Sequence, residues 1–143
     1  MSPLSRMLAT LALAAGGAVF GTGCATPPAA PPGAALLGPE WVVEDLDKAG
    51  IVDRSRITLH FGIDGRVAGL ASCNQYGGSY RVEQGRLVVS HVVATLRACP
   101  PALMAQERRF LDLLDTPLRI ERTPDGALVL RGDGHQGLTA RRP

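Results

Sequence analysis

Cysteine, histidine and glutamate side chains are the groups of this chain best suited to chemistry, and several of them fall close together. Cys73 and Cys99 enclose His91, and Glu107 follows shortly after the second cysteine. A cysteine beside a histidine base can act as a nucleophile, cysteines with a histidine can bind zinc, and two cysteines can form a disulfide. The chain has neither C-x-x-C nor H-x₃-H spacing, which disfavours a metal site.

The first 23 residues have the layout of a secretory signal peptide. Arg6 supplies a positive charge, and residues 7–20 form an apolar stretch that is short for a membrane span. The segment ends in Gly21-Thr22-Gly23-Cys24, which resembles the bacterial lipobox, although Gly21 stands where leucine is usual. We therefore expect residues 1–23 to be removed and Cys24 to be lipidated. An ordinary signal peptide followed by a chance cysteine is the alternative.

The segment after Cys24 predicts a tether. Residues 24–38 are rich in proline and alanine and carry no charge, so they suit an extended linker rather than a packed core. Ala25 follows the cysteine, and by resemblance to lipoprotein sorting in Gram-negative bacteria this favours the outer membrane. We expect one folded domain over residues 39–143.

Lipidation of Cys24 leaves Cys73 and Cys99 as a pair in an oxidising compartment, which predicts a disulfide between them. The chain-entropy model gives such a bond about 3.5 kcal/mol of stabilisation. The alternative is a reactive Cys73 thiol with His91 as its base, and this requires the two side chains to meet in the fold.

Hydrophobic patterns predict strands with one helix. Residues 56–61 alternate between apolar and polar side chains, as a half-buried strand does. Apolar residues recur at helical spacing from Pro101 to about Leu114. The fold class that we expect is α+β, mainly β: an antiparallel β-meander, curved or barrel-like, with one α-helix (about 101–115) packed on it. Other short strands are expected at 40–43, 66–70, 78–82, 86–90, 92–96, 118–122, 127–131 and 138–141.

The residues just after Cys73 suit a turn or a bulge. Asn74 tolerates a left-handed backbone, and Gly77 and Gly78 allow a positive φ or a β-bulge. Tyr76 and Tyr80 could line a binding surface, because each has a flat apolar ring and a polar tip. Core packing with a hydrogen-bonded hydroxyl is the favoured interpretation of both tyrosines.

Glu107 lies on the apolar stripe of the predicted helix. A buried carboxylate needs hydrogen-bond donors or a cationic partner, and Arg97 is a candidate partner. We favour a structural clamp. A general acid is the alternative, but no second carboxylate accompanies Glu107.

Several motifs of this chain are specific enough to compare with a known family: Trp41, Gly69, Cys73-Asn74, Tyr76-Gly77-Gly78-Ser79-Tyr80, Gly85-x-Leu87, Thr95-x-x-x-Cys99 and Glu107-x-x-Phe110. In these motifs the sequence resembles the META domain family, which includes the heat-inducible lipoprotein HslJ. The resemblance spans about residues 41–139 and implies a small barrel-like domain of the bacterial envelope, associated with stress and antibiotic tolerance. It brings no established catalytic residues.

The expected function is therefore non-enzymatic. A formal net charge of +2 without a run of basic residues argues against nucleic acid. We expect a lipoprotein held at the membrane by its N-terminal lipid, without cofactor or metal, that binds an unknown envelope protein or small ligand. The alternatives are an inhibitor of an enzyme such as lysozyme, and a periplasmic thiol enzyme that uses Cys73.

Overall fold

The computed structural model describes residues 33–134 and 136–143. The predicted signal peptide, Cys24 and most of the predicted tether lie outside these residues. No helix in the described ranges is both long enough and apolar enough to cross a membrane. The elements are β1 (Trp41–Leu46), β2 (Thr58–Phe61), β3 (Arg66–Leu70), β4 (Gln75–Glu83), β5 (Arg86–Ala94), α1 (Pro101–Leu114), β6 (Leu118–Arg122), β7 (Leu128–Arg131) and β8 (Gly137–Arg141).

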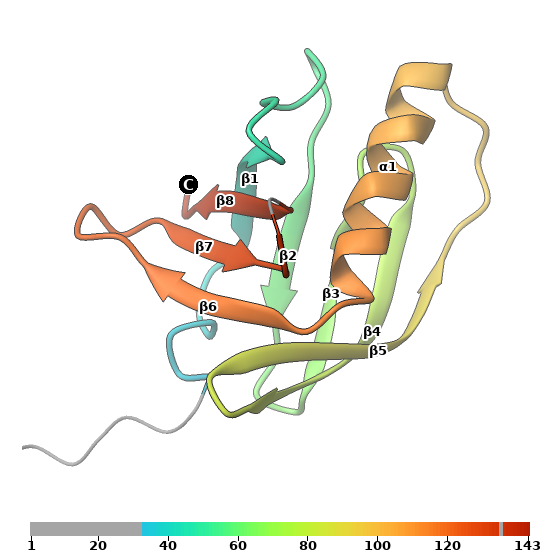
Figure 1. Ribbon diagram of the computed structural model, residues 1–143. Helices are drawn as coiled ribbons and strands as arrows, with labels where there is room; N and C mark the ends of the chain where they lie inside the picture. The colour runs from blue at the N-terminus through green and yellow to red at the C-terminus, as the bar shows by residue number, and fades with distance from the viewer. Residues whose placement is uncertain (1–32, 135) are drawn as a thin grey trace, which may run out of the picture.

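The eight strands form a closed antiparallel barrel in which each strand pairs with its neighbours in sequence and β8 pairs with β1. Figure 1 shows α1 standing alongside the β3–β5 part of the barrel, away from β7 and β8. The β5–β6 pairing is short, with Arg86 and Leu87 opposite Arg119 and Leu118, and α1 lies in the connection between these two strands. The predicted α+β, mainly β, barrel-like fold with one helix is confirmed.

Alternate strand residues fill the barrel, as period-2 patterning requires. Trp41 from β1 and Leu59 from β2 are fully buried, and α1 contributes Phe110 and Leu114 to the same core. The other fully buried core side chains are Leu36, Val43, Leu46, Ile57, Ala71, Leu87, Leu118, Leu128, Leu130 and Ala140.

One boundary prediction was wrong. Residues 86–90 and 92–96 were expected to be two strands, but β5 runs continuously from Arg86 to Ala94. His91 takes a φ of 54°, and the β4–β5 register shifts opposite Gly77 and Ser79. This bulge inserts an extra residue without ending the ladder, so the alternation breaks while the strand continues.

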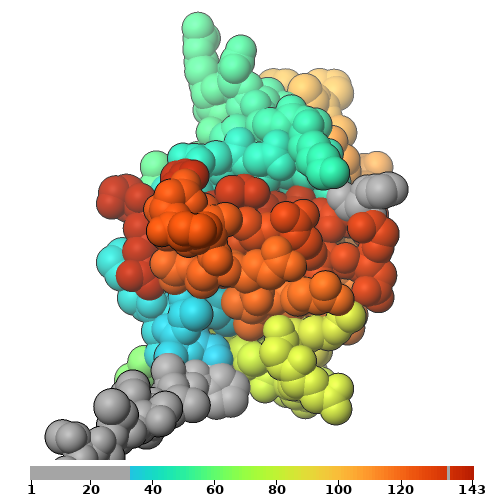
Figure 2. Space-filling view, turned by 60° about the vertical axis from the view of Figure 1, so that its left-hand side comes forward, coloured from blue at the N-terminus to red at the C-terminus, as the bar shows by residue number. Residues whose placement is uncertain are grey.

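The chain is already packed before the predicted start of the domain. Leu36, placed in the tether by its composition, is fully buried, and its carbonyl accepts a 2.9 Å hydrogen bond from the Trp41 indole nitrogen. The guanidinium groups of Arg122 and Arg142 lie 4.8 and 4.5 Å from the Trp41 ring centre. Both arginines also donate to carbonyls of residues 33–38. Figure 2 shows this blue segment below the orange and red strands β6–β8.

Candidate functional site

The two cysteines of the domain are joined. The sulfur atoms of Cys73, in the β3–β4 loop, and Cys99, just before α1, form a disulfide with a Cα–Cα distance of 6.1 Å. The disulfide predicted from the cysteine count is therefore present. The sulfur of Cys73 is not a free thiol in this structure, and among the described residues His91 makes no side-chain hydrogen bond to it.

Glu107 holds the backbone at the disulfide. One carboxylate oxygen (Oε2) accepts hydrogen bonds from the backbone N–H groups of Cys73 at 3.2 Å and Asn74 at 2.7 Å. The other (Oε1) accepts a 2.9 Å bond from the Asn74 side-chain amide. The Glu107 side chain is thus buried with three donors around it. These hydrogen bonds offset the free-energy cost of removing a carboxylate from water.

Asn74 ties the same loop to the segment before the helix. Its side-chain oxygen accepts bonds from the Thr95 hydroxyl at 2.8 Å and from the Arg97 backbone N–H at 2.7 Å. Its amide nitrogen also donates to the Arg97 carbonyl at 3.2 Å. These hydrogen bonds join the two segments that carry the disulfide cysteines. Asn74 is almost fully buried, so the bonds lie inside the protein.

Arg97 does not form the predicted pair with Glu107. Its guanidinium instead donates a 2.6 Å hydrogen bond to the carbonyl of Cys73, and no Arg97–Glu107 ion pair occurs in the described residues. The physical reason is that backbone and amide N–H groups already occupy the carboxylate. Arg97 approaches the loop from its exposed side, where a carbonyl is the available acceptor.

Gln106 completes the arrangement, and our sequence reasoning missed it. This side chain is fully buried, and its oxygen accepts a 2.7 Å bond from the Val52 backbone. Its nitrogen donates to the hydroxyls of Ser55 at 2.8 Å and Ser72 at 3.0 Å. The available signal was its place beside Glu107 on the buried stripe of the helix. We call the set Asn74, Thr95, Arg97, Gln106 and Glu107 the polar clamp.

The two tyrosines pack as parts of the scaffold. The Tyr76 hydroxyl donates a 3.0 Å bond to the Thr58 carbonyl, and its ring meets Phe110 edge-on with centres 5.3 Å apart. Tyr80 donates a 2.8 Å bond to the Gly62 carbonyl and lies edge-on to a second phenylalanine. Burial raises the pKa of both hydroxyls above the ordinary tyrosine value, most strongly for Tyr76.

The two adjacent glycines have opposite environments. Gly78 is buried, and a Cβ added there would lie 2.9 Å from the Ser90 carbonyl oxygen. Gly77 is half-buried, and a Cβ would meet only the Val67 carbonyl oxygen at 3.8 Å, an ordinary contact. The φ of Gly77 also lies outside the left-handed region. A side chain at position 78 would therefore clash with the backbone, whereas one at position 77 would not.

Two shallow clefts lie side by side on the outer surface near these residues. One, of about 280 Å³, is lined by Glu40, Thr58, Ala68, Gly69, Leu70, Gln75 and Tyr76. The other, of about 360 Å³, is lined by Leu70, Gln75, Thr95 and Arg97. Leu70 and Gln75 line both clefts.

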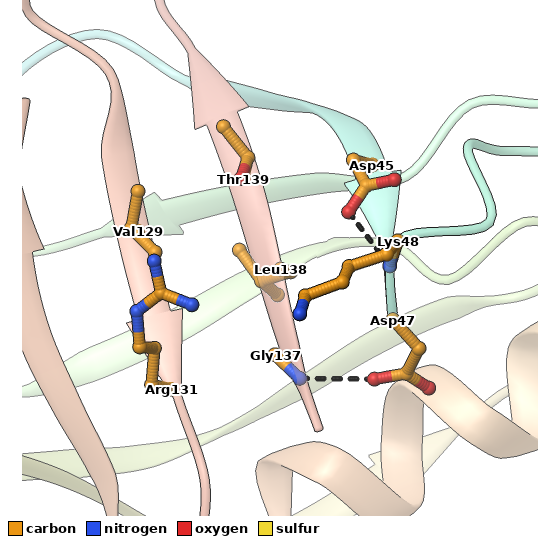
Figure 3. A pocket seen from close by; sticks show the side chains of 8 residues that line it. All are labelled: Asp45, Asp47, Lys48, Val129, Arg131, Gly137, Leu138 and Thr139. Atoms are coloured by element: carbon orange, nitrogen blue, oxygen red, sulfur yellow. Dashed lines mark hydrogen bonds between the residues drawn. The ribbon is translucent and has the colours of Figure 1, made fainter. Parts of the chain in front are cut away.

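A third cleft, of about 150 Å³, lies between the end of β1 and strands β7 and β8 (Figure 3). Figure 3 shows its two carboxylates bound to backbone nitrogens. Asp45 accepts from the Lys48 N–H at 3.0 Å, and Asp47 accepts from the Gly137 N–H at 2.9 Å. Both carboxylates are used in hydrogen bonds that hold the loop after β1. Within the described residues, no three His, Cys, Asp or Glu side chains are grouped to hold a metal.

Comparison with known proteins agrees with this architecture. The sequence matches no curated protein. An NMR structure of a protein from Burkholderia xenovorans has a TM-score of 0.64 and 23% identity, covering 84% of this chain and 96% of the other. A second NMR structure has a TM-score of 0.62 and 21% identity, covering 75% and 91%. These similarities concern the fold. A sequence model of the META domain matches residues 34–143, which include the whole barrel and helix, so the chain belongs to the META domain family.

Proposed function

We propose that the protein is a lipoprotein of the bacterial outer membrane whose META domain acts by binding and not by catalysis. In this proposal the domain faces the periplasm, is anchored through Cys24, and serves the envelope stress response or antibiotic tolerance. Its partner is an envelope protein or a small ligand.

The observation that carries the non-catalytic role is the saturation of the polar clamp. The Cys73 sulfur is in a disulfide, and the Glu107 carboxylate accepts three hydrogen bonds. Within the described residues, every buried side-chain nitrogen and oxygen has a hydrogen-bond partner. A general acid or nucleophile needs a group free to exchange a proton or attack a substrate. The clamp residues are engaged in holding the loop, which supports a structural role for them.

The anchoring part of the proposal rests on the lipobox-like sequence around Cys24. A single acyl chain binds a bilayer only marginally, whereas several acyl chains give stable anchoring. Packing of Leu36 against the barrel core would fix where the tether joins the domain.

Fractionation tests the anchor. Cys24→Ser should move the protein from the membrane fraction to the soluble periplasmic fraction, because the lipid attachment atom is lost. Thr22→Ala keeps a small residue before the cysteine and serves as the matched control, which should stay with membranes. Unchanged fractionation of Cys24→Ser would refute lipidation at this residue.

Thiol titration and complementation test the binding role. The native protein should show no thiol at Cys73 or Cys99 before reduction. In a deletion strain under envelope stress, a Cys73→Ala/Cys99→Ala double variant should restore growth in proportion to its abundance. Two free thiols in the native protein, or loss of growth at wild-type abundance, would support the thiol enzyme instead. Strong inhibition of lysozyme by the purified protein would identify the inhibitor alternative.

A further inference from the structure

Arg122 and Arg142 carry positive charges that the fold holds in place but does not neutralise. Their guanidinium groups lie 4.8 and 4.5 Å from the centre of the buried Trp41 ring. Their hydrogen bonds go to backbone carbonyls, among them those of Ala35 and Leu37. A carbonyl or an aromatic ring orients a guanidinium without cancelling its charge. The fold therefore presents two positive charges against one ring.

The acidic side chains near this pair do not cancel its charge. Asp125 and Glu44 share one partner, Arg141, which binds them through different guanidinium nitrogens. The ion pairs among the described residues include neither Arg122 nor Arg142. Three arginines thus face two carboxylates, and the group keeps a positive charge. Because Arg122 and Arg142 are exposed, a negative group outside the domain can reach them.

The tether joins the domain next to these arginines. Residues 33–38 include the carbonyls that Arg122 and Arg142 bind, and Gly33 follows Cys24 by nine residues. A chain extends by at most about 3.6 Å per residue, so the two residues lie no more than roughly 32 Å apart. In the proposed lipoprotein, a bilayer is therefore always close to the arginine pair. Figure 1 shows the blue segment and the ends of β6 and β8 on the left, and α1 on the right.

An exposed apolar side chain lies near the same junction. Ile63, in the β2–β3 turn, has 93% of its surface accessible. The turn contacts β4, where the Tyr80 N–H donates to the Gly65 carbonyl, and Gly33 lies against Val82 on the same strand. One exposed isoleucine is ordinary on a protein surface, but this one lies beside the start of the tether. We call Ile63 and the two arginines, Arg122 and Arg142, the anchor face.

We propose that the anchor face rests on the bilayer that holds the protein. Arg122 and Arg142 bind the phosphates of anionic lipid headgroups, and Ile63 reaches their boundary with the acyl chains. An arginine near an anionic bilayer surface strengthens binding about fivefold, which is weak for a free protein but effective when a tether keeps the surface close. β4 runs from the polar clamp to the tether side, so the clamp then faces away from the membrane. This inference rests on the proposed lipid anchor and names the surface that the anchored domain contacts.

Charge and chemistry separate a bilayer from other occupants of this face. A second copy of the domain that used the same face would bring two further arginines against the first pair, and like charges repel. A free phosphate would bind the arginines and leave Ile63 in water. A bilayer offers phosphates and an apolar region together, and the tether already holds it within reach.

Arginine reactivity in liposomes tests the contact. The protein purified in detergent is reconstituted into liposomes of phosphatidylcholine, alone or mixed with anionic phosphatidylglycerol. Phenylglyoxal modifies accessible arginines, and mass spectrometry measures the rate at each one. Arg122 and Arg142 should react about fivefold more slowly in the anionic liposomes. Arg108 and Arg109, exposed on α1, should react equally in both. Equal rates at Arg122 and Arg142 would overturn the proposal.

A soluble anion identifies the source of the phosphate. Glycerol phosphate is added to the neutral liposomes in place of the anionic lipid, and it should leave the rates at Arg122 and Arg142 unchanged. Protection as large as that from phosphatidylglycerol would assign the pair to a soluble phosphate ligand and overturn the bilayer contact.

Energy transfer from Trp41 to a dansyl-labelled lipid gives a second measurement, because Trp41 lies against both arginines and is the only tryptophan. Transfer should be higher in anionic than in neutral liposomes. Arg122→Gln/Arg142→Gln should abolish this difference. Arg108→Gln/Arg109→Gln removes the same charge from α1 and should keep the difference. Equal behaviour of the two glutamine variants would contradict the assignment.

A lysine variant separates charge from packing. Arg122→Lys/Arg142→Lys keeps both charges and loses the guanidinium contacts with residues 33–38, so the difference between the liposomes should remain. Its loss in a lysine variant that urea unfolding shows to be folded would mean that the arginines act by packing this segment, and would overturn the headgroup contact.

Flotation distinguishes this proposal from the anchor itself. The wild-type protein should float with neutral and anionic liposomes alike, because acyl chains hold it in both. Flotation with both, together with unchanged arginine rates, would refute the headgroup contact and leave the anchor standing. Flotation with anionic liposomes alone would refute the anchor and support the contact, and flotation with neither would refute both.

Discussion

Replacement of Glu107 by glutamine tests whether the polar clamp stabilises the fold. The carboxylate accepts bonds from the backbone of Cys73 and Asn74 with one oxygen and from the Asn74 amide with the other. A glutamine of nearly the same shape has one oxygen and one NH₂ group. In either orientation its NH₂ group faces a donor of the loop, so at least one bond is lost and two donors oppose each other.

The magnitude follows from the type of bond. A hydrogen bond to a charged group contributes about 1.5–3 kcal/mol, so Glu107→Gln should lower the free energy of unfolding by about 2–3 kcal/mol. For a domain of this size, each kcal/mol corresponds to about 4–8 °C, which predicts a fall in Tm of about 8–24 °C. Glu107→Ala removes both acceptor oxygens, and with them all three hydrogen bonds, and should cost about 3–5 kcal/mol.

Urea denaturation of the oxidised full chain, purified in detergent, measures this effect. Trp41 is the only tryptophan and is fully buried, so its fluorescence reports unfolding of the barrel. Glu121→Gln is the matched control. Its ion pair with Arg131, at 3.0 Å, is between partly exposed side chains and should contribute less than about 1 kcal/mol. A Glu107→Gln variant within about 0.5 kcal/mol of wild type would refute the clamp, because that is the range of ordinary surface substitutions.

A paired substitution tests the geometry itself. Asn74→Asp alone sets a second carboxylate against Glu107 and should be more destabilising than Glu107→Gln. In the double variant the new amide can donate to the new carboxylate, which reverses the direction of the bond. Recovery should be partial, because the Asn74 amide also donates to the Arg97 carbonyl. Coupling of at least about 1 kcal/mol is expected for residues in one network, and strict additivity would contradict the contact.

Three further predictions concern the scaffold. Reduction of the Cys73–Cys99 bond should lower the free energy of unfolding by about 3.5 kcal/mol in urea titrations, and an unchanged midpoint would show that the bond does not constrain the unfolded chain. The Tyr76 pKa is raised by burial, so the folded state holds the phenolic proton longer and stability should fall as pH rises above the ordinary value of 10.0. Tyr76→Phe should flatten that slope, as followed by unfolding at pH 8–11, and an unchanged slope would point to other groups. Gly69→Ala should be less stable than wild type, because its Cβ would overlap the Thr58 carbonyl. Gly77→Ala meets no such contact and should raise the free energy of unfolding by about 0.5–1 kcal/mol. Similar melting temperatures for these two alanine variants would be the contrary result.

Local patterns predicted most of the secondary structure. Alternation over residues 56–61 places Ile57, Leu59 and Phe61 on one face, and all three are buried. Helical spacing and the prolines before it located α1, which begins at Pro101 and ends at Leu114. Side-chain periodicity follows from backbone geometry within a few residues, so the sequence carries this information directly.

The two features that local sequence patterns predicted incorrectly, the start of the packed chain and the course of β5, depend on contacts outside those patterns. Leu36 follows a proline-rich linker, but the barrel end accepts it and the Trp41 indole binds its carbonyl. The bulge at His91 lets one strand continue where the alternation breaks. The segment around Leu36 is also held by the distant residues Arg122 and Arg142, and the bulge depends on the pairing of β5 with β4.

By itself, the sequence determined the strands, the helix, the cysteine pairing and the resemblance to the META family, because these depend on residue types and short spacings. The tertiary structure decided how β8 closes on β1 and which donors satisfy Glu107. It also decided that Gly78 faces inward and Gly77 outward. These outcomes depend on which distant backbone groups come within hydrogen-bond reach when the barrel closes, and that is a property of the whole fold.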